Sequence, residues 1–249
     1  MKLTVVGMAG TFPGPASGCS SYLLEHDGFR MLLDIGNGST GALQEACGLL
    51  GPDAVIVSHL HGDHYLDLIT YTYARRYHPD GMPSKLHVYG PRTIRQSVVG
   101  AYARDVDELL DEVYVFHPVE REGVCEVGPF EVDLRHVNHP VETFGMRVSA
   151  GGRTLTYSAD TGQTDALVGL ARDANLFLCE ASYLEGEQNP PDVHLTGLQA
   201  GEYATRAGVE KLVLTHLVPW GDASRSLAEA QRSYDGDVVL AHRLQSYDV

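Results

Sequence analysis

Three histidines and one aspartate lie within six consecutive residues of this 249-residue chain, and their side chains could bind a metal ion. They are His59, His61, Asp63 and His64. Imidazole nitrogens and carboxylate oxygens are the ligands that hard and borderline divalent metals use in proteins, and Gly62 would let the backbone turn sharply among them. We therefore interpret this segment as a metal site, in preference to a chance group of histidines on a polar loop.

The elements that must position this cluster follow a mixed pattern of strands and helices. Residues 54–57 form a short apolar run that predicts a buried strand leading directly into the cluster. Further strands are predicted at 3–6, 21–24, 31–34, 85–89, 176–179, 211–215 and 238–240, with three or four more between residues 113 and 158. Helices are predicted at 42–50, 65–76, after Pro91, and at 165–171, 197–207 and 224–233. A strand-rich core with helices spread along the chain indicates a layered α/β sandwich.

Composition narrows the classes of function. The formal net charge of −15 argues against a large nucleic-acid surface, because such surfaces are usually basic. No apolar run approaches the roughly 18–20 residues of a transmembrane helix, and residues 1–7 are predicted as a first strand rather than a signal peptide. Four widely spaced cysteines predict reduced thiols in a cytoplasmic protein. We see no repeat and no long linker, so we expect one hydrolase domain over residues 1–249.

The cluster also carries a family resemblance. His-x-His-x-Asp-His at a strand end resembles the hallmark of the metallo-β-lactamase superfamily, and the segment at Asp34 resembles its upstream Asp-x-Gly turn. His139, Asp160 and His216 each end an apolar strand in the order that the family uses. Ala159 departs from the pattern, since the motif usually has glycine before its bridging aspartate. The resemblance implies a four-layer αββα sandwich that covers nearly the whole chain.

The resemblance also implies two divalent ions, zinc by preference, with manganese and iron as alternatives. One ion would be held by His59, His61 and His139 and the other by Asp63, His64 and His216, with Asp160 bridging them. Asp34 would orient a ligand by hydrogen bonding; its alternative role is that of a turn aspartate. Two metals suit phosphoester displacement, because they stabilise both the attacking and the leaving oxygen. Asp63 would help to take a proton from the attacking water.

A second pair of residues refines the reaction. The block containing Glu180, His194-Leu195-Thr196 and Leu214-Thr215-His216 resembles the phosphodiesterase branch that includes ribonuclease Z. There, a matching glutamate and histidine assist proton transfer. We expect Glu180 to orient His194, and His194 to protonate the leaving alkoxide or to steady the phosphate. The alternative makes Thr196 a helix N-cap and His194 a residue that merely flanks it.

The size of the expected substrate follows from the absence of an RNA-binding arm in the sequence. Ribonuclease Z grips transfer RNA with an arm inserted between its third histidine and its bridging aspartate, but a strand–turn–strand with Gly151-Gly152 fills that interval here. A small phosphodiester is therefore expected. Several stretches, among them Phe12-Pro13-Gly14-Pro15 and residues 190–195, resemble actinobacterial 3′,5′-cyclic-nucleotide phosphodiesterases, which release 5′-monophosphates.

Other hypotheses remain open on the sequence alone. They are a ribonuclease Z-like nuclease, a lactonase or thioesterase that would not need Glu180 and His194, and a non-catalytic metal-binding sensor.

Residues 65–78 are rich in tyrosine and arginine. These side chains could stack a base and pair a phosphate, or they could belong to the core and surface of the helix predicted there. Partners are limited to a small phosphodiester and a possible second copy of the chain, with no membrane.

Overall fold

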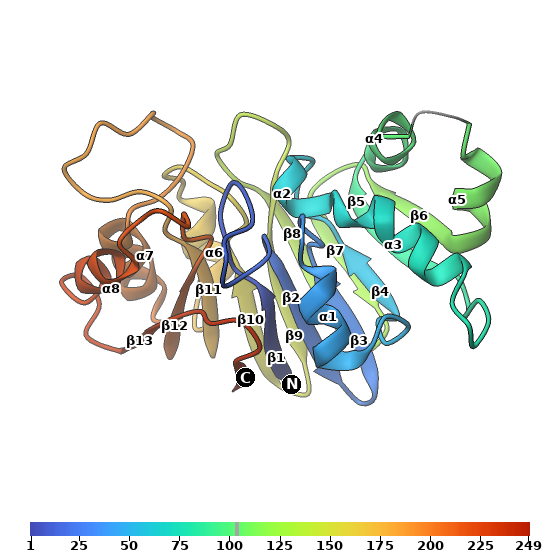
Figure 1. Ribbon diagram of the computed structural model, residues 1–249. Coiled ribbons are helices and arrows are strands. Elements are labelled where there is room, and N and C mark those ends of the chain that lie inside the picture. Colours follow the sequence, from blue (N-terminus) through green and yellow to red (C-terminus); the bar gives the residue numbers. More distant parts are fainter. Residues whose placement is uncertain (103–104) are drawn as a thin grey trace.

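Two β-sheets form the centre of the protein. The computed structural model describes residues 1–102 and 105–249 (Figure 1). In spatial order, the first sheet contains β14 (Ser246–Asp248), β1 (Lys2–Gly7), β2 (Ser21–His26), β3 (Phe29–Leu33), β4 (Ala54–Ile56), β5 (Leu86–Pro91) and β6 (Tyr114–Val119). The second contains β13 (Asp237–Leu240), β12 (Lys211–Thr215), β11 (Leu176–Glu180), β10 (Arg153–Tyr157), β9 (Phe144–Ala150), β8 (Phe130–His136) and β7 (Gly123–Val127).

Alternating side chains place an apolar layer on each face of both sheets. In β2, Tyr22 and Leu24 enter the core between the sheets, whereas Leu23 packs on the outer side. In β11, Leu178 points into the same central core and Phe177 packs outward. Both faces of these strands are buried, which requires a cover over each outer face.

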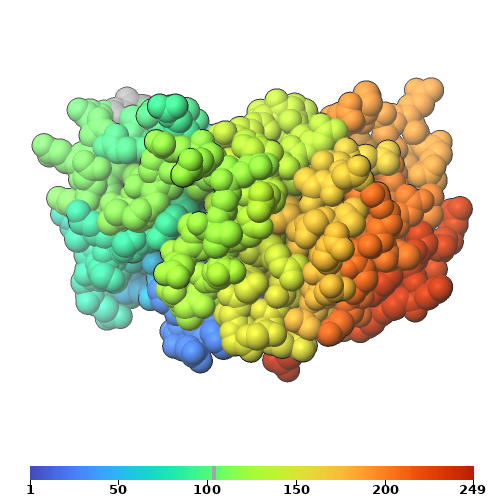
Figure 2. Space-filling view, turned by 180° about the vertical axis from the view of Figure 1, so that it is seen from behind, coloured from blue at the N-terminus to red at the C-terminus, as the bar shows by residue number. Residues whose placement is uncertain are grey.

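Helices supply those covers. The first sheet is covered by α1 (Thr40–Cys47), α3 (Asp67–Arg76), α4 (Ile94–Gly100) and α5 (Asp107–Val113), and the four-residue α2 (Gly62–Tyr65) precedes α3. The second sheet is covered by α6 (Ala166–Ala171), α7 (Gly197–Ala207) and α8 (Ala223–Ala230). Seen from behind, the two halves of the chain occupy opposite sides of the molecule (Figure 2). The predicted four-layer αββα sandwich is confirmed.

The structure also corrects several details. Five strands, β6 to β10, lie where three or four were expected. Helix α5 and the short edge strand β14 were not predicted, and α1 ends at Cys47 rather than at residue 50 because Gly48 leaves the helix with a φ of 76°. Within the described ranges, no helix is both long and apolar enough to cross a membrane.

The aromatic and basic helix after the cluster is largely structural. Tyr71 and Arg75 are buried, and they bind the backbone carbonyl oxygens of Leu49 and Ser84. Tyr73 and Tyr77 lie on its outer side and stack on each other, with ring centroids 6.3 Å apart. The buried side chains of this helix therefore support the interpretation that they belong to the protein core and do not bind a ligand.

Candidate metal centre

The chemically active side chains gather at one edge of the sandwich, because each follows the same end of a strand. Asp34 follows β3, the segment from His59 to His64 follows β4, Asp160 follows β10, and His216 follows β12. β3 and β4 run parallel, as do β10, β11 and β12, so their carboxyl ends meet at one edge, where α/β proteins bind ligands.

The first group of candidate ligands contains His59, His61, His139 and Asp160. Nδ1 of His61 lies 3.2 Å from Nε2 of His59 and 3.1 Å from Nε2 of His139. Asp160 Oδ2 lies 3.7 Å from His59 Nε2. Such separations fit atoms that share one ion at about 2.0–2.2 Å.

The second group contains Asp63, His64, Asp160 and His216. Nε2 of His216 lies 3.1 Å from Asp63 Oδ2, 3.3 Å from Asp160 Oδ2 and 3.4 Å from His64 Nε2. The other oxygen of Asp160 lies 3.2 Å from His64 Nε2. Asp160 therefore belongs to both groups, which is the position expected of a bridging carboxylate.

Four of the histidines form a hydrogen bond through Nδ1, which leaves Nε2 directed toward the other candidate ligands. Nδ1 of His59 contacts Ser58 Oγ at 3.0 Å, and Nδ1 of His139 contacts the Val193 carbonyl at 2.9 Å. The remaining two contacts pair His64 Nδ1 with Asp34 Oδ2 and His216 Nδ1 with Ser182 Oγ, each at 2.7 Å. Such contacts fix the tautomer and the ring orientation of a metal ligand.

Asp34 has the orienting position expected from the sequence. Its carboxylate accepts hydrogen bonds from the Ser58 backbone N–H at 2.6 Å and from Tyr157 Oη at 2.8 Å, in addition to its contact with His64. The side chain is fully buried. Asp34 adopts a φ of 60°, a left-handed conformation that aspartate tolerates better than most residues.

The charge states of the three histidines of the first group and of Asp160 suit a cation, whereas protons compete for His64. Burial lowers the pKa values of His59, His61 and His139, which keeps these imidazoles neutral and able to donate a lone pair. Burial alone would raise the pKa of Asp160, but His216 and His64 hold it well below its usual range. For His64, burial alone would lower the pKa, but the negative charges of Asp160 and Asp34 raise it well above 6.5.

These residues fit a pair of divalent ions. Oδ1 of Asp160 is buried and has no hydrogen-bond donor among the described residues, although buried polar atoms are normally partnered. It lies 3.2 Å from Nε2 of His64, among the ligand atoms of the second group. Histidine nitrogens and carboxylate oxygens accept zinc, manganese or iron.

Glu180 and His194 form a third contact group beside the other two. Nδ1 of His194 lies 2.9 Å from Oε1 of Glu180, as expected from the sequence. The Thr161 backbone N–H donates to the same oxygen at 2.7 Å, and the carboxylate is fully buried. The ring of His194 lies 5.6 Å from that of His139 and 5.2 Å from that of His216, measured between centroids.

The electrostatics of this pair favour a protonated imidazole. Burial alone would lower the pKa of His194, but the Glu180 carboxylate more than offsets it and the pKa rises to about 9. Thr196 is also an N-cap: its side chain accepts from the Gln199 backbone N–H and forms a capping box at the start of α7. The cap and the Glu180–His194 pair thus occur together, whereas the sequence presented them as alternatives.

Sequence reasoning missed three supporting residues. Ser58, Tyr157 and Ser182 bind Asp34 or His216 but received no role, although each lies within three residues of an assigned one. The backbone at Ala159 has a φ of 52°, in the left-handed region that favours glycine. This conformation accounts for the glycine that the motif usually has at this position.

Comparison with known proteins extends these observations. A family model described as a beta-lactamase superfamily domain matches residues 30–217. An uncharacterized protein from Mycobacterium tuberculosis is 40% identical over 243 residues, which cover 96% of this chain and 88% of that protein. A Chlamydia trachomatis protein named ribonuclease Z is 26% identical, with 99% of this chain and 96% of that protein covered.

A solved structure agrees with the sequence matches. The metallo-β-lactamase fold protein YhfI from Bacillus subtilis superimposes with a TM-score of 0.88 at 26% identity, covering 99% of this chain and 98% of that one. The same relative is named a probable metallo-hydrolase. The fold, the types of the candidate ligands and the names of the relatives are therefore all consistent with a metal-dependent hydrolase.

Proposed function

The chain belongs to the beta-lactamase superfamily and is a metal-dependent hydrolase, and on that premise we propose that it is a di-metal phosphodiesterase. Its substrates are small phosphodiesters, with 3′,5′-cyclic nucleotides hydrolysed to 5′-monophosphates. The observation that carries this proposal is the Glu180–His194 pair, 2.9 Å apart at the edge of both ligand groups.

The proposed roles divide the site between ion binding and proton transfer. His59, His61 and His139 would hold one divalent ion, Asp63, His64 and His216 would hold the other, and Asp160 would be shared between them. When bound, two divalent ions stabilise the charge on the attacking and leaving oxygens of a phosphoryl displacement. We favour zinc, because its coordination suits histidine and carboxylate ligands.

Asp63 acts as the acceptor for the proton of the attacking water. Burial alone would raise its pKa, but its hydrogen bond with His216 keeps that pKa far below the usual range, so the carboxylate is ionised at neutral pH. The Thr11 backbone N–H donates to its Oδ2 at 2.8 Å, which fixes the carboxylate in place.

His194 acts as the proton donor to the leaving oxygen. Its Nδ1 is engaged by Glu180, which leaves Nε2 for the substrate. A ribose alkoxide is a strong base and leaves slowly unless it is protonated, so a positioned imidazolium contributes about 10²–10⁴-fold to the rate. Ester hydrolysis by a lactonase or thioesterase would not need this pair.

A ribonuclease Z-like nuclease is the second candidate, favoured by the Chlamydia trachomatis relative. Against it, the interval between His139 and Asp160 holds only β9, the turn at Gly151 and Gly152, and β10. A net charge of −15 also disfavours a polyanionic substrate. These two features support a small substrate.

The proposal is tested by incubating the zinc-loaded protein with cyclic AMP, with a precursor transfer RNA and with a panel of esters and lactones. Conversion of cyclic AMP to 5′-AMP, abolished in Asp160→Ala, supports the proposal. Cleavage of the transfer RNA alone would favour the nuclease, and turnover of esters or lactones alone would refute phosphodiester chemistry.

A further inference from the structure

A pocket of about 720 Å³ opens directly beside His194, and the proposed chemistry leaves most of it unused. His194, Ser182 and Thr11 are among its lining residues. Ser182 contacts His216 and Thr11 contacts Asp63, so the pocket borders the second ligand group. A substrate whose phosphate lay at the ions would have its remaining atoms near this space.

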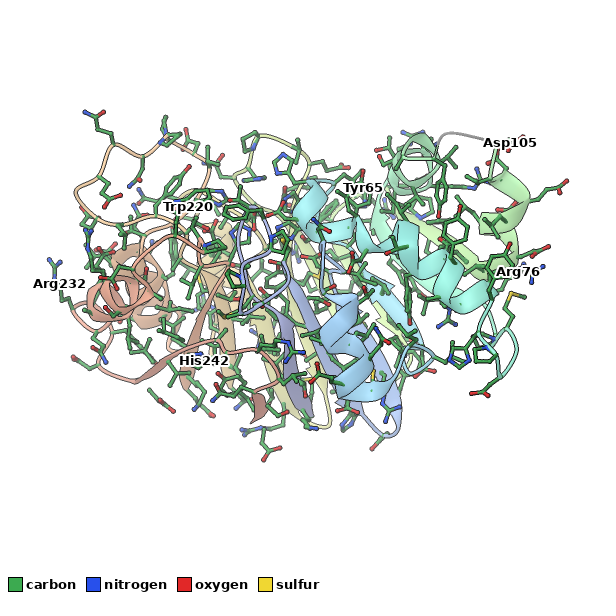
Figure 3. All side chains as sticks on the ribbon, viewed as in Figure 1. Tyr65, Arg76, Asp105, Trp220, Arg232 and His242 are labelled. Carbon is green, nitrogen blue, oxygen red and sulfur yellow. The ribbon has the colours of Figure 1, made fainter. Side chains whose placement is uncertain are left out.

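An aromatic ring of the pocket wall stacks on a second ring behind it. Phe12 and Trp220 stack with centroids 4.5 Å apart and ring planes 25° from parallel, and Trp220 lines the pocket. The side chain of Trp220 is nevertheless exposed, with a relative accessibility of 75%. Ligand pockets are lined largely by apolar and aromatic side chains with a few polar groups, and Trp220 beside His194 has this character. Figure 3 shows Trp220 on the same edge of the molecule as Tyr65, which directly follows the candidate ligand His64.

The backbone fixes this ring pair relative to the candidate metal ligands. Ala9 and Leu217 form an isolated β-bridge, and the Leu217 N–H donates to the Met8 carbonyl at 3.1 Å. Phe12 and Trp220 each lie three residues beyond that bridge. Because Thr11 binds Asp63 and Leu217 follows His216, both loops are anchored at candidate ligands.

The charges in the pocket favour a neutral occupant. Arg225 pairs with Glu187 at 3.1 Å, and Asp222 adds a further carboxylate. Apart from His194, the charged lining therefore carries no excess positive charge that would hold a second phosphate. A neutral, flat heteroaromatic group fits both the charge and the exposed indole face.

We propose that Trp220, backed by Phe12, is the stacking platform for the base of a nucleotide substrate. The inference rests on the proposed function for the presence of a base in the substrate, and it makes Trp220 the residue that selects phosphodiesters carrying a base over those without one. Bases stack on aromatic side chains with little dependence on sequence, since every base has a π face. The site would thus accept purine and pyrimidine nucleotides.

The chain carries its own reporter, because Trp220 is its single tryptophan. The zinc-loaded protein is titrated with 5′-AMP and, separately, with ribose 5-phosphate, which has the same phosphate and sugar but no base. We expect 5′-AMP to quench the tryptophan emission and ribose 5-phosphate to leave it unchanged. Equal responses, or no response to 5′-AMP, would overturn the proposal.

Kinetics provide the second readout. Trp220→Leu should raise the KM for cyclic AMP about 10-fold or more with kcat little changed, and Phe12→Leu should act in the same direction while retaining the fluorophore. Tyr77→Leu is the matched control, because Tyr77 is another exposed, stacked aromatic residue on a different element. An unchanged KM in both pocket variants would count against the platform.

The outcomes separate this inference from the proposed function. Base-dependent quenching without hydrolysis of cyclic AMP would keep the platform and refute the proposed reaction. Hydrolysis that is indifferent to Trp220 and to the base would keep the reaction and overturn the platform. If Trp220→Leu instead converts a dimer to a monomer in sedimentation velocity, with KM unchanged, the ring covers a second copy of the chain and the proposal is wrong.

Discussion

Glu180 and His194 are joined by a 2.9 Å hydrogen bond between Oε1 and Nδ1, across 14 positions of sequence. Glu180 ends β11, whereas His194 precedes α7 by three residues. The carboxylate is held by the backbone N–H groups of Thr161 and Ser182, so its direction does not depend on His194. We interpret the pair as a fixed acceptor that orients the proton donor.

The first prediction concerns pH. The pKa of His194 rises to about 9 because Glu180 outweighs burial, so the imidazolium persists at neutral pH and is lost as the pH rises through that value. We expect hydrolysis of cyclic AMP to decline on the alkaline side. In Glu180→Gln the burial effect remains and the charge is gone, so the alkaline limb should move to lower pH by about one unit or more. An unmoved limb in the kcat profile would refute the assignment.

Much of the site could be predicted from residue types at strand ends. His59, His61, Asp63 and His64 are adjacent in sequence, and His139, Asp160 and His216 each follow a strand. The carboxyl ends of parallel strands share an edge, so the convergence of these residues into two groups follows from the topology.

Other features depend on contacts that no local pattern records. Phe12 and Trp220 are 208 positions apart and meet only because Ala9 and Leu217 form a bridge. The sequence also did not show which face of each strand lies against which layer. In β11, Leu178 and Phe177 are both apolar, yet they face different cores. A strand buried on both sides gives no alternation from which to assign its faces.

The second prediction concerns Asp34. Because its Oδ2 lies 2.7 Å from Nδ1 of His64, Asp34→Asn should weaken zinc binding by about 10- to 100-fold through misorientation of that ring. Competition with a chromophoric chelator measures the change. Asp53→Asn is the control, since Asp53 accepts a backbone hydrogen bond from Arg30 at a turn away from the ligands. Equal affinities in the two variants would show that Asp34 is only a turn residue.

The third prediction concerns metal removal. Bound ions stabilise the folded state by mass action, about 4 kcal/mol at a free concentration 1,000 times the Kd, so a chelator should lower the Tm of the zinc-loaded protein. Asp160 and Asp34 raise the pKa of His64, which means that protons compete with the ion. The Tm increase given by zinc should therefore shrink as the pH falls. A zinc effect that survives in Asp160→Ala would contradict the assigned bridge.

The fourth prediction separates the helix cap from the proton donor. Thr196→Ala removes the capping box of α7 and should cost about 1 kcal/mol of unfolding free energy, with kcat retained. His194→Ala should instead lose turnover, and because it leaves the buried Glu180 carboxylate without its ion-pair partner it should also lower the denaturant midpoint. If Thr196→Ala lost as much activity as His194→Ala, the two residues would have to act as one structural unit.

The central claim is that His194 protonates the leaving oxygen of a phosphodiester, and leaving-group dependence tests it most directly. The measurement is kcat for His194→Gln and the unsubstituted protein on cyclic AMP and on bis-p-nitrophenyl phosphate, whose leaving phenolate needs no proton. We predict a loss of about 10²-fold or more on cyclic AMP and a far smaller loss on the activated diester. Equal losses on both substrates, or none on either, would contradict the account.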